Sequence, residues 1–323
     1  MSNVDLVQNA DYLSERLQAA KSELGKVIFG QDQVIEQSLI ALLSGGHALL
    51  VGVPGLAKTK LVTSISQVLA LPSKRVQCTP DLMPADILGA EVLEETAEGK
   101  RQFRFIEGPV FTNLLMADEI NRASPRTQSA LLQAMQEREV SIAGQNMKLP
   151  TPFHVFATQN PIEQEGTYPL PEAQLDRFLL DIRVDYPDAD AERRMLIETT
   201  TGADESLGAT MSTDDLLAGQ ALVRAMPIGE QVVDAILTLV RSARPSGDAN
   251  SDLSWGAGPR AGQALMLAVR AKALIDGRYA PSLDDVVTLA PAVLRHRVAL
   301  SFGARAEGQT NETYIANLLS DFA

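Results

Sequence analysis

The sequence predicts an α/β fold, a domain built on a parallel five-stranded sheet and followed by an all-helical domain. Two observations lead to this prediction. Up to about residue 187, short apolar runs typical of buried strands are separated by stretches long enough for crossover helices. After Tyr186-Pro187-Asp188 only helical patterns follow. We therefore expect an α/β domain at residues 1–187 and a helical domain at residues 188–323.

The strands of the sheet are expected at the apolar runs His47–Val51, Arg75–Thr79, Asn113–Asp118, His154–Thr158 and Leu179–Val184. Two other stretches, Glu91–Ile106 and Val140–Phe153, each have a polar centre between apolar arms. Both are expected to form β-hairpins inserted beside the sheet.

The helical domain is expected to contain helices at Ala189–Thr199, Thr213–Ala225, Gly229–Ala243, Pro259–Ile275 and Leu283–Ala290, with a loop at 246–250. The chain begins with an amphipathic pattern, Met1–Leu24, which lacks the basic start and continuous apolar stretch of a signal peptide. The uncharged segment Gln37–Ala57 has the length of a membrane span, but several glycines and a proline interrupt it. We interpret it as a buried helix, a turn and a buried strand, and expect a soluble protein without stable membrane insertion.

Composition limits the partners and the compartment. The net charge is −13, and acidic residues exceed basic ones both before and after residue 187. Nucleic acid and anionic membrane surfaces are therefore not expected as main partners. The single cysteine, Cys78, excludes an intramolecular disulfide and fits the reducing cytoplasm, where it is expected to be a small core residue. The three histidines lie far apart without paired ligands, so no zinc site is expected.

The first motif with chemical meaning is Gly52-Val53-Pro54-Gly55-Leu56-Ala57-Lys58-Thr59, between an expected strand and an expected helix. Backbone N–H groups of such a loop, together with the helix N-terminus, surround phosphate oxygens. Lys58 is expected to bind the β- and γ-phosphates, and Thr59 to give its hydroxyl to Mg²⁺. The strict pattern has glycine before the lysine. Here Ala57 occupies that place, although the strand–loop–helix context is intact.

Two further motifs follow apolar strands. Asp118 and Glu119 end the run Asn113–Asp118, and in a parallel sheet they come close to the phosphate loop. Asp118 is expected to hold Mg²⁺ through water, and Glu119 to polarise the attacking water. Asn160 follows the run His154–Thr158. On its spacing alone Asn160-Pro161 is a common turn. In company with the other two motifs, we interpret Asn160 as the residue that orients the nucleophilic water.

The order of these motifs resembles that of AAA+ proteins. It continues with Leu175-Asp176-Arg177-Phe178 and Gly258-Pro259-Arg260-Ala261. Three segments closely resemble sequences of the MoxR family: Ala117–Ala123 (ADEINRA), Ala157–Gly166 (ATQNPIEQEG) and, near the C-terminus, Leu289–Arg297 (LAPAVLRHR). The resemblance covers roughly residues 25 to 300.

This resemblance implies a P-loop AAA+ core with a helical lid, an ATPase that uses ATP with Mg²⁺ in a homo-oligomeric ring, usually of six subunits. It implies that Arg177 is the finger that reaches the γ-phosphate of the next subunit, and that Arg260 senses the same phosphate. Ile28, Phe29 and Gly30, within Val27–Gln31, resemble the stretch beside adenine. The two hairpins match the helix-2 and pre-sensor-1 inserts of the clade that includes magnesium-chelatase motors.

Members of the MoxR family typically act with von Willebrand factor A domain partners, as chaperones for a client protein or in cofactor insertion. Three alternative functions are a magnesium-chelatase-like motor subunit, a small-molecule P-loop kinase and a DNA-linked motor. The sequence lacks the acceptor-pocket motif that a small-molecule kinase would need, and the excess of acidic residues disfavours binding to DNA. The sequence leaves open whether Arg122, Arg126, Arg295 and Arg297 line a subunit boundary or are solvated and salt-bridged.

Overall fold

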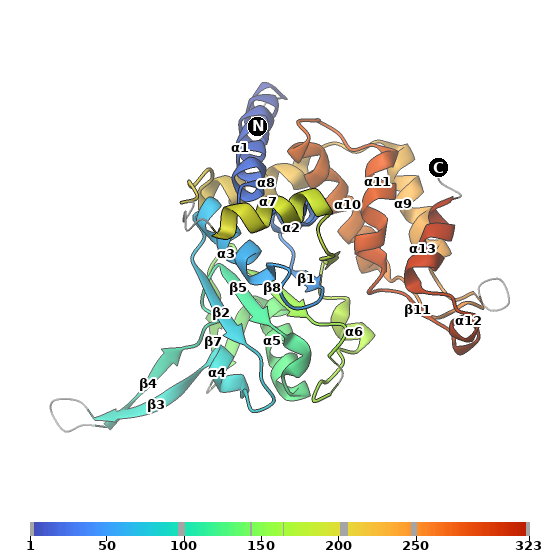
Figure 1. Ribbon diagram of the computed structural model, residues 1–323. Helices are drawn as coiled ribbons and strands as arrows, with labels where there is room; N and C mark the ends of the chain where they lie inside the picture. The colour runs from blue at the N-terminus through green and yellow to red at the C-terminus, as the bar shows by residue number, and fades with distance from the viewer. Residues whose placement is uncertain are drawn as a thin grey trace.

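The computed structural model describes residues 3–95, 101–142, 144–163, 165–200, 206–246 and 251–320 (Figure 1). Its centre is a sheet of five parallel strands in the order β2-β5-β8-β1-β9. These strands are β1 (Ala48–Val51), β2 (Ser73–Gln77), β5 (Leu114–Asp118), β8 (His154–Gln159) and β9 (Leu180–Arg183). The predicted five-stranded parallel sheet is confirmed.

The inner strands differ from the edge strand β2. Every residue of β1 and β5 is buried, which explains their unbroken apolar runs, since helices cover both faces of the sheet. Of β2, only Val76 is buried. It begins two residues before the predicted start at Arg75, because an exposed edge strand has little apolar signal to mark its bounds.

Helices pack on the two faces of the sheet. Leu50 of β1 shares a core with α1 (Asn3–Gly25), α2 (Asp32–Leu43) and α3 (Lys58–Val68). Leu49, which points the other way, shares a second core with α5 (Pro125–Glu137). Three short helices, α4 (Pro84–Leu88), η1 (Ile120–Arg122) and α6 (Glu172–Leu175), connect the strands. No helix of the described residues is long and apolar enough to cross a membrane.

Both predicted hairpins are present. β3 (Gly89–Glu95) pairs with β4 (Arg101–Glu107), and β6 (Glu139–Ile142) pairs with β7 (Gln145–Lys148). The predicted polar centres lie partly outside the described residues, at 96–100 and 143. The β3–β4 hairpin projects away from the rest of the molecule (Figure 1).

The second half of the chain begins with α7 (Ala189–Thr200) and continues with α8 (Thr213–Ala225), α9 (Glu230–Ser242), α10 (Pro259–Ile275), α11 (Leu283–Leu294), α12 (Phe302–Ala306) and α13 (Asn311–Ser320). We call α8 to α13 the lid. The expected loop at 246–250 lies almost wholly outside the described residues.

Two expectations for this half were wrong. It is not all-helical, because β10 (Leu253–Trp255) pairs antiparallel with β11 (Ala299–Leu300). Strands of three and two residues are too short to show alternation in the sequence. In addition, α11 continues through Pro291 instead of ending at Ala290, and the buried Val293 and Leu294 lie in its last turn.

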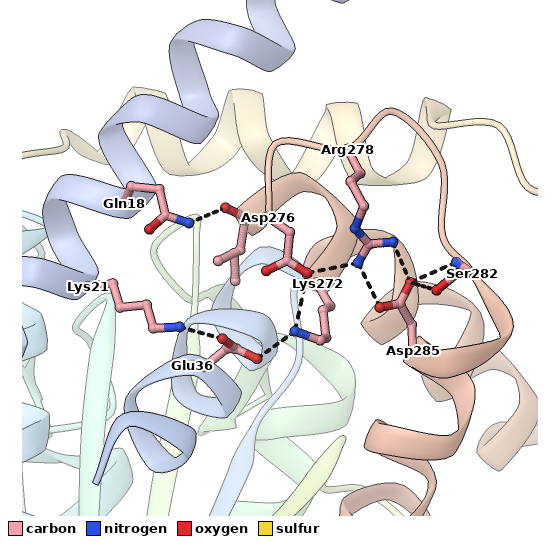
Figure 2. A network of polar contacts seen from close by, with 9 residues as sticks. Gln18, Lys21, Glu36, Lys272, Asp276, Arg278, Ser282 and Asp285 are labelled. Atoms are coloured by element: carbon pink, nitrogen blue, oxygen red, sulfur yellow. Dashed lines mark hydrogen bonds and ion pairs between the residues drawn. The ribbon is translucent and has the colours of Figure 1, made fainter. Parts of the chain in front are cut away.

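A network of charged side chains joins the lid to the first helices (Figure 2). The two carboxylate oxygens of Glu36, on α2, accept hydrogen bonds from Lys21 of α1 and from Lys272 of α10. Gln18 of α1 donates to the Ile275 carbonyl at the end of α10, at 2.6 Å. The network therefore fixes the last turns of α10 to the α1–α2 pair.

The same network continues to the start of α11 (Figure 2). Arg278 donates to both oxygens of Asp285, at 2.8 and 2.7 Å, and to Asp276 at 2.8 Å. Asp285 also accepts from the backbone N–H and hydroxyl of Ser282, the residue that caps α11. This bidentate pair holds the α10–α11 connection in place.

The charge on Glu36 is expected to stabilise the fold in a pH-dependent way. Burial alone would raise the pKa of Glu36, but the hydrogen bonds from Lys21 and Lys272 outweigh burial and keep this pKa below 4.5. A carboxyl group whose pKa is lowered by folding adds stability above its unfolded pKa and loses it as the pH falls. We expect Glu36→Gln to lower the free energy of unfolding by about 2 kcal/mol at neutral pH.

The measurement is urea unfolding of wild type and Glu36→Gln at neutral pH and below pH 4.5. The difference between the two proteins is expected to shrink at the lower pH. Glu15→Gln, at an exposed position of the same helix as Lys21, serves as the control and should change stability little. An equal loss at both pH values would contradict the role of the charge.

Candidate functional site

The predicted phosphate loop, Gly52–Thr59, connects β1 to α3 as expected. Lys58 is the first residue of α3, and its ammonium donates to the carbonyl oxygens of Gly52 and Val53, at 2.8 and 2.7 Å. An ammonium has three N–H groups, so one remains for an anion once these two are used. Burial lowers the pKa of Lys58, and the carboxylates of Asp118 and Glu119 oppose this effect.

Two residues explain the backbone of the loop. Ala57, at the place where the strict pattern has glycine, adopts φ 56°, a left-handed conformation that costs an L-residue about 1–2 kcal/mol. The loop conformation is thus retained without the glycine. Gly52 is required for a different reason: a Cβ there would lie 2.4 Å from the Val184 carbonyl oxygen, where the loop leaves the sheet beside β9.

Asp118 and Glu119 are held in place by the strand on either side of β5. The Thr158 hydroxyl of β8 donates to Asp118 and accepts from the Glu119 N–H at 2.8 Å. From β2, Arg75 donates to Asp118, with its Nε 3.1 Å from Oδ2, and Gln77 donates to Glu119 Oε2 at 2.8 Å. Both carboxylates are therefore aimed by neighbours in the sheet.

The backbone at Glu119 is also unusual. Its φ and ψ of 55° and 52° lie in the left-handed region, where a residue other than glycine is strained. Arg122, one turn further, donates to the same Oε2 oxygen at 3.0 Å. Among the described residues, Oε1 of Glu119 accepts no hydrogen bond, so it remains for a water molecule.

Asn160 forms a turn and also lines a cavity. Its Oδ1 accepts from the Ile162 N–H at 3.1 Å, which is the turn geometry expected of Asn before Pro. Its Nδ2 lies 3.4 Å from Glu163. At the same time Asn160, which is 9% exposed, lines the cavity described next.

These residues surround one cavity of about 360 Å³, which we call the phosphate cavity. It is lined by residues 54–59 of the loop together with Asp118, Glu119, Thr158 and Asn160. Backbone N–H groups at the start of α3, a lysine ammonium and a threonine hydroxyl beside a carboxylate are the donor set that suits a phosphate chain with Mg²⁺. The Thr59 hydroxyl and the Asp118 carboxylate are oxygen groups of the kind that would fit such an ion.

A second cavity of about 270 Å³, the base cavity, adjoins the first and shares residues 54–57 with it. Its other lining residues include Ile28, Phe29, Tyr186, Pro187 and Met195 of α7. Gly30 is not among the lining residues. A Cβ at Gly30 would be 2.5 Å from the Ala191 side chain of α7, so the glycine lets α7 approach.

Arg177 and Arg260 are not brought to the phosphate cavity. They line a third cavity of about 280 Å³, the arginine cavity, together with Arg138, Arg297 and the segment Gly45–His47. This cavity lies at the amino end of β1, whereas the loop follows its carboxyl end. The four residues of β1 separate the two, about 13 Å at 3.3 Å per residue.

The ion pairs of Arg177 and Arg297 differ, although both residues line the arginine cavity. Among the described residues, no carboxylate pairs with the Arg177 guanidinium. Its neighbour Asp176 pairs instead with Arg297, at 2.7 Å, and lies 3.7 Å from Arg260. Arg297 is thus a salt-bridged residue, and its side chain is 3% exposed.

Sequence reasoning missed several residues around the acids. Arg75 and Gln77 lie two apart on an edge strand, where polar side chains look like ordinary surface. Thr158 was included in an apolar run and received no role of its own. Their spacing could have identified Arg75 and Gln77. Residues two apart in a strand point to the same face, and β2 pairs with β5, which carries Asp118.

Comparison with known proteins agrees with this geometry. Residues 47–180 match the model of the ATPase family associated with various cellular activities (AAA), and residues 247–318 match an AAA lid domain. The chain is 42% identical to Chaperone MoxR1 of Mycobacterium tuberculosis, over 95% of this chain and 82% of that protein. It is 33% identical to Protein MoxR of Paracoccus denitrificans, covering 88% and 89% of the two chains.

A solved structure supports the same assignment. The crystal structure of a candidate ATPase from Cytophaga hutchinsonii superimposes with a TM-score of 0.88 at 36% sequence identity. The match covers 97% of this chain and 96% of that one, so the sheet and the lid are both included.

Proposed function

The chain belongs to the MoxR family of AAA ATPases, and from this we propose that it hydrolyses ATP to remodel a client protein in the manner of a chaperone. One observation carries the proposal: Lys58, Asp118, Glu119 and Asn160 line a single cavity beside a second cavity of a size and character suited to a base. The division of the chain at residue 187, into a nucleotide-binding domain and a helical domain that includes α7 as well as the lid, belongs to the same proposal.

In this proposal each group of the phosphate cavity has a separate task. Loop N–H groups and Lys58 bind the phosphate oxygens. Thr59 and Asp118 hold Mg²⁺, which supplies further positive charge to those oxygens. Glu119 accepts the proton of the attacking water through Oε1, while Gln77 and Arg122 keep its other oxygen fixed. Asn160 orients the same water.

The site of one subunit is incomplete without a second subunit. A phosphoryl group in transfer needs positive charge beyond the loop lysine, and an arginine commonly supplies it. Arg177 precedes the amino end of β9, while every group of the phosphate cavity lies at or just beyond the carboxyl end of a strand. We propose that Arg177 and Arg260, which line the same cavity, both act on the nucleotide of the next subunit in a homo-oligomeric ring, with six subunits as the family resemblance implies.

The client is proposed to contact the inserted hairpins. Phe103 of β4 and Leu93 of β3 face each other across the hairpin, and they are 71% and 54% exposed. Exposed apolar side chains on a projecting element are typical of a surface that contacts another protein. The von Willebrand factor A domain partner and the role in cofactor insertion follow from the family resemblance and complete the proposal.

The hydrolytic assignment is tested with three variants. Lys58→Ala is expected to abolish ATP binding because it removes the charge that faces the phosphates. Glu119→Gln should bind ATP as wild type does but lower turnover by about 10²–10⁴-fold. Asp118→Asn should mainly weaken the dependence on Mg²⁺ and the rate. The measurements are ATP affinity and phosphate release, and a Glu119→Gln protein that keeps most of its activity would refute the assignment.

Action across the subunit boundary is tested by mixing inactive variants. Arg177→Ala should bind ATP normally yet be slower by about 10³–10⁵-fold, the usual contribution of such an arginine. Mixed with Lys58→Ala, it should regain activity, because intact sites of one variant then face intact arginines of the other. If subunit exchange is confirmed and no activity returns, Arg177 does not act in trans.

The client surface is tested by removing its apolar side chains. Phe103→Ser with Leu93→Ser should leave basal ATP hydrolysis unchanged and abolish the ATP-dependent protection of a heat-unfolded model protein from aggregation. Glu94→Ser with Gln102→Ser, a facing polar pair of the same hairpin, is the matched control. Loss of basal hydrolysis in the apolar variant would show that the hairpin is structural instead.

A further inference from the structure

The backbone on both sides of Arg177 is bound by the lid. The Arg297 guanidinium donates to Asp176 Oδ1 at 2.7 Å, to the Phe178 carbonyl at 2.6 Å and to the Leu179 carbonyl at 3.1 Å. His296 Nε2 donates to the same Phe178 carbonyl at 3.0 Å. Two consecutive residues after α11 thus hold the residues before and after Arg177.

The Asp176 carboxylate also faces Arg260, a further arginine of the arginine cavity. Its Oδ2 lies 3.7 Å from Arg260 Nη1, at the start of α10, while Oδ1 is taken by Arg297. One carboxylate therefore lies between the end of α11 and the beginning of α10. The Asp176 carboxylate therefore links the segment that carries Arg177 to Arg260, although the two arginines are 83 positions apart in the chain.

Stability alone is a weak explanation for this arrangement. Burying a guanidinium and a carboxylate carries a desolvation cost that often equals the gain from their pairing, so apolar residues of similar size can stabilise a fold equally well. A bidentate or bridging carboxylate does, however, fix geometry in a way that apolar contacts do not. A residue that must reach the phosphate of a neighbouring subunit needs a fixed position, since a misplacement of about 1 Å can lower the rate about 10²-fold.

We propose that Asp176 and Arg297 are positioning residues that hold Arg177 in register with Arg260, so that the lid of one subunit sets the rate of hydrolysis in the next. The inference rests on the proposed action of Arg177 across the subunit boundary. Asp176 and Arg297 do not themselves touch the nucleotide in this scheme. They act through the direction in which the Arg177 side chain leaves its backbone.

The test uses Asp176→Asn, which keeps the size of the side chain and removes its charge. The variant should bind ATP with wild-type affinity, because the phosphate and base cavities of its own subunit contain none of the altered groups. Its kcat should fall about 10–10²-fold. Rings mixed with Lys58→Ala should regain activity, since Lys58→Ala subunits supply an intact Asp176 and Arg177.

Two further variants separate position from stability. Asp176→Glu keeps the charge but moves the carboxylate by one methylene, and it too should lower kcat with little change in thermal unfolding. Asp285→Asn removes a lid carboxylate that pairs with an arginine, Arg278, remote from the arginine cavity. It should lower the unfolding temperature and leave kcat near the wild-type value.

The possible results are distinguishable. If Asp176→Asn and Asp176→Glu keep kcat within twofold of wild type while Arg177→Ala is inactive, the positioning role is refuted and the proposed function stands. If Arg177→Ala is active as well, the proposed action in trans fails. If the Asp176 variants lose ATP affinity along with kcat, or are not rescued by Lys58→Ala subunits, Asp176 is a structural residue and the inference is wrong.

Discussion

The parallel direction of all five strands is the constraint on which the rest of the structure depends. Parallel pairing places every carboxyl end at one edge of the sheet and every amino end at the other. The phosphate loop, Asp118, Glu119 and Asn160 follow carboxyl ends and therefore meet. Arg177 precedes an amino end and therefore cannot reach them. A chain with this topology has the phosphate cavity at the carboxyl ends of its strands and the arginine cavity at the amino end of β1.

Strained backbone and hydrogen-bonded charges position the residues of the phosphate cavity. Ala57 and Glu119 both adopt the left-handed conformation, one at the entry to α3 and one directly after β5. Strained residues persist where surrounding contacts hold them, and here the Thr158 hydroxyl binds the backbone N–H of Glu119. The hydrogen bonds from β2 and β8 thus offset the backbone strain at Glu119 and the repulsion between the two neighbouring carboxylates.

The sequence predicted the parts of the site that depend on local pattern and strand direction. The loop, the two acids and Asn160 were identified because each follows an apolar run, and the parallel sheet then brings them together. It could not reveal contacts between distant segments: Asp176 and Arg297 are 121 residues apart, and neither stands out among the charged residues around it. Arg75 on an edge strand and the short β10–β11 pair were missed because few of their residues are buried. The fold was thus predictable from periodicity, whereas the partners of the site residues depended on tertiary packing.

The two ends of α10 have different attachments, and this makes the helix a lever. Lys272, near one end, is fixed by Glu36 to the α1–α2 pair, while Arg260, at the other end, lines the arginine cavity. The twelve residues between them give an arm of about 18 Å at 1.5 Å per residue, so a tilt of about 10° about the fixed end displaces the guanidinium by about 3 Å. That displacement is about the length of a hydrogen bond. A small rotation of this single helix would therefore make or break a contact of the Arg260 side chain with no rearrangement of the sheet.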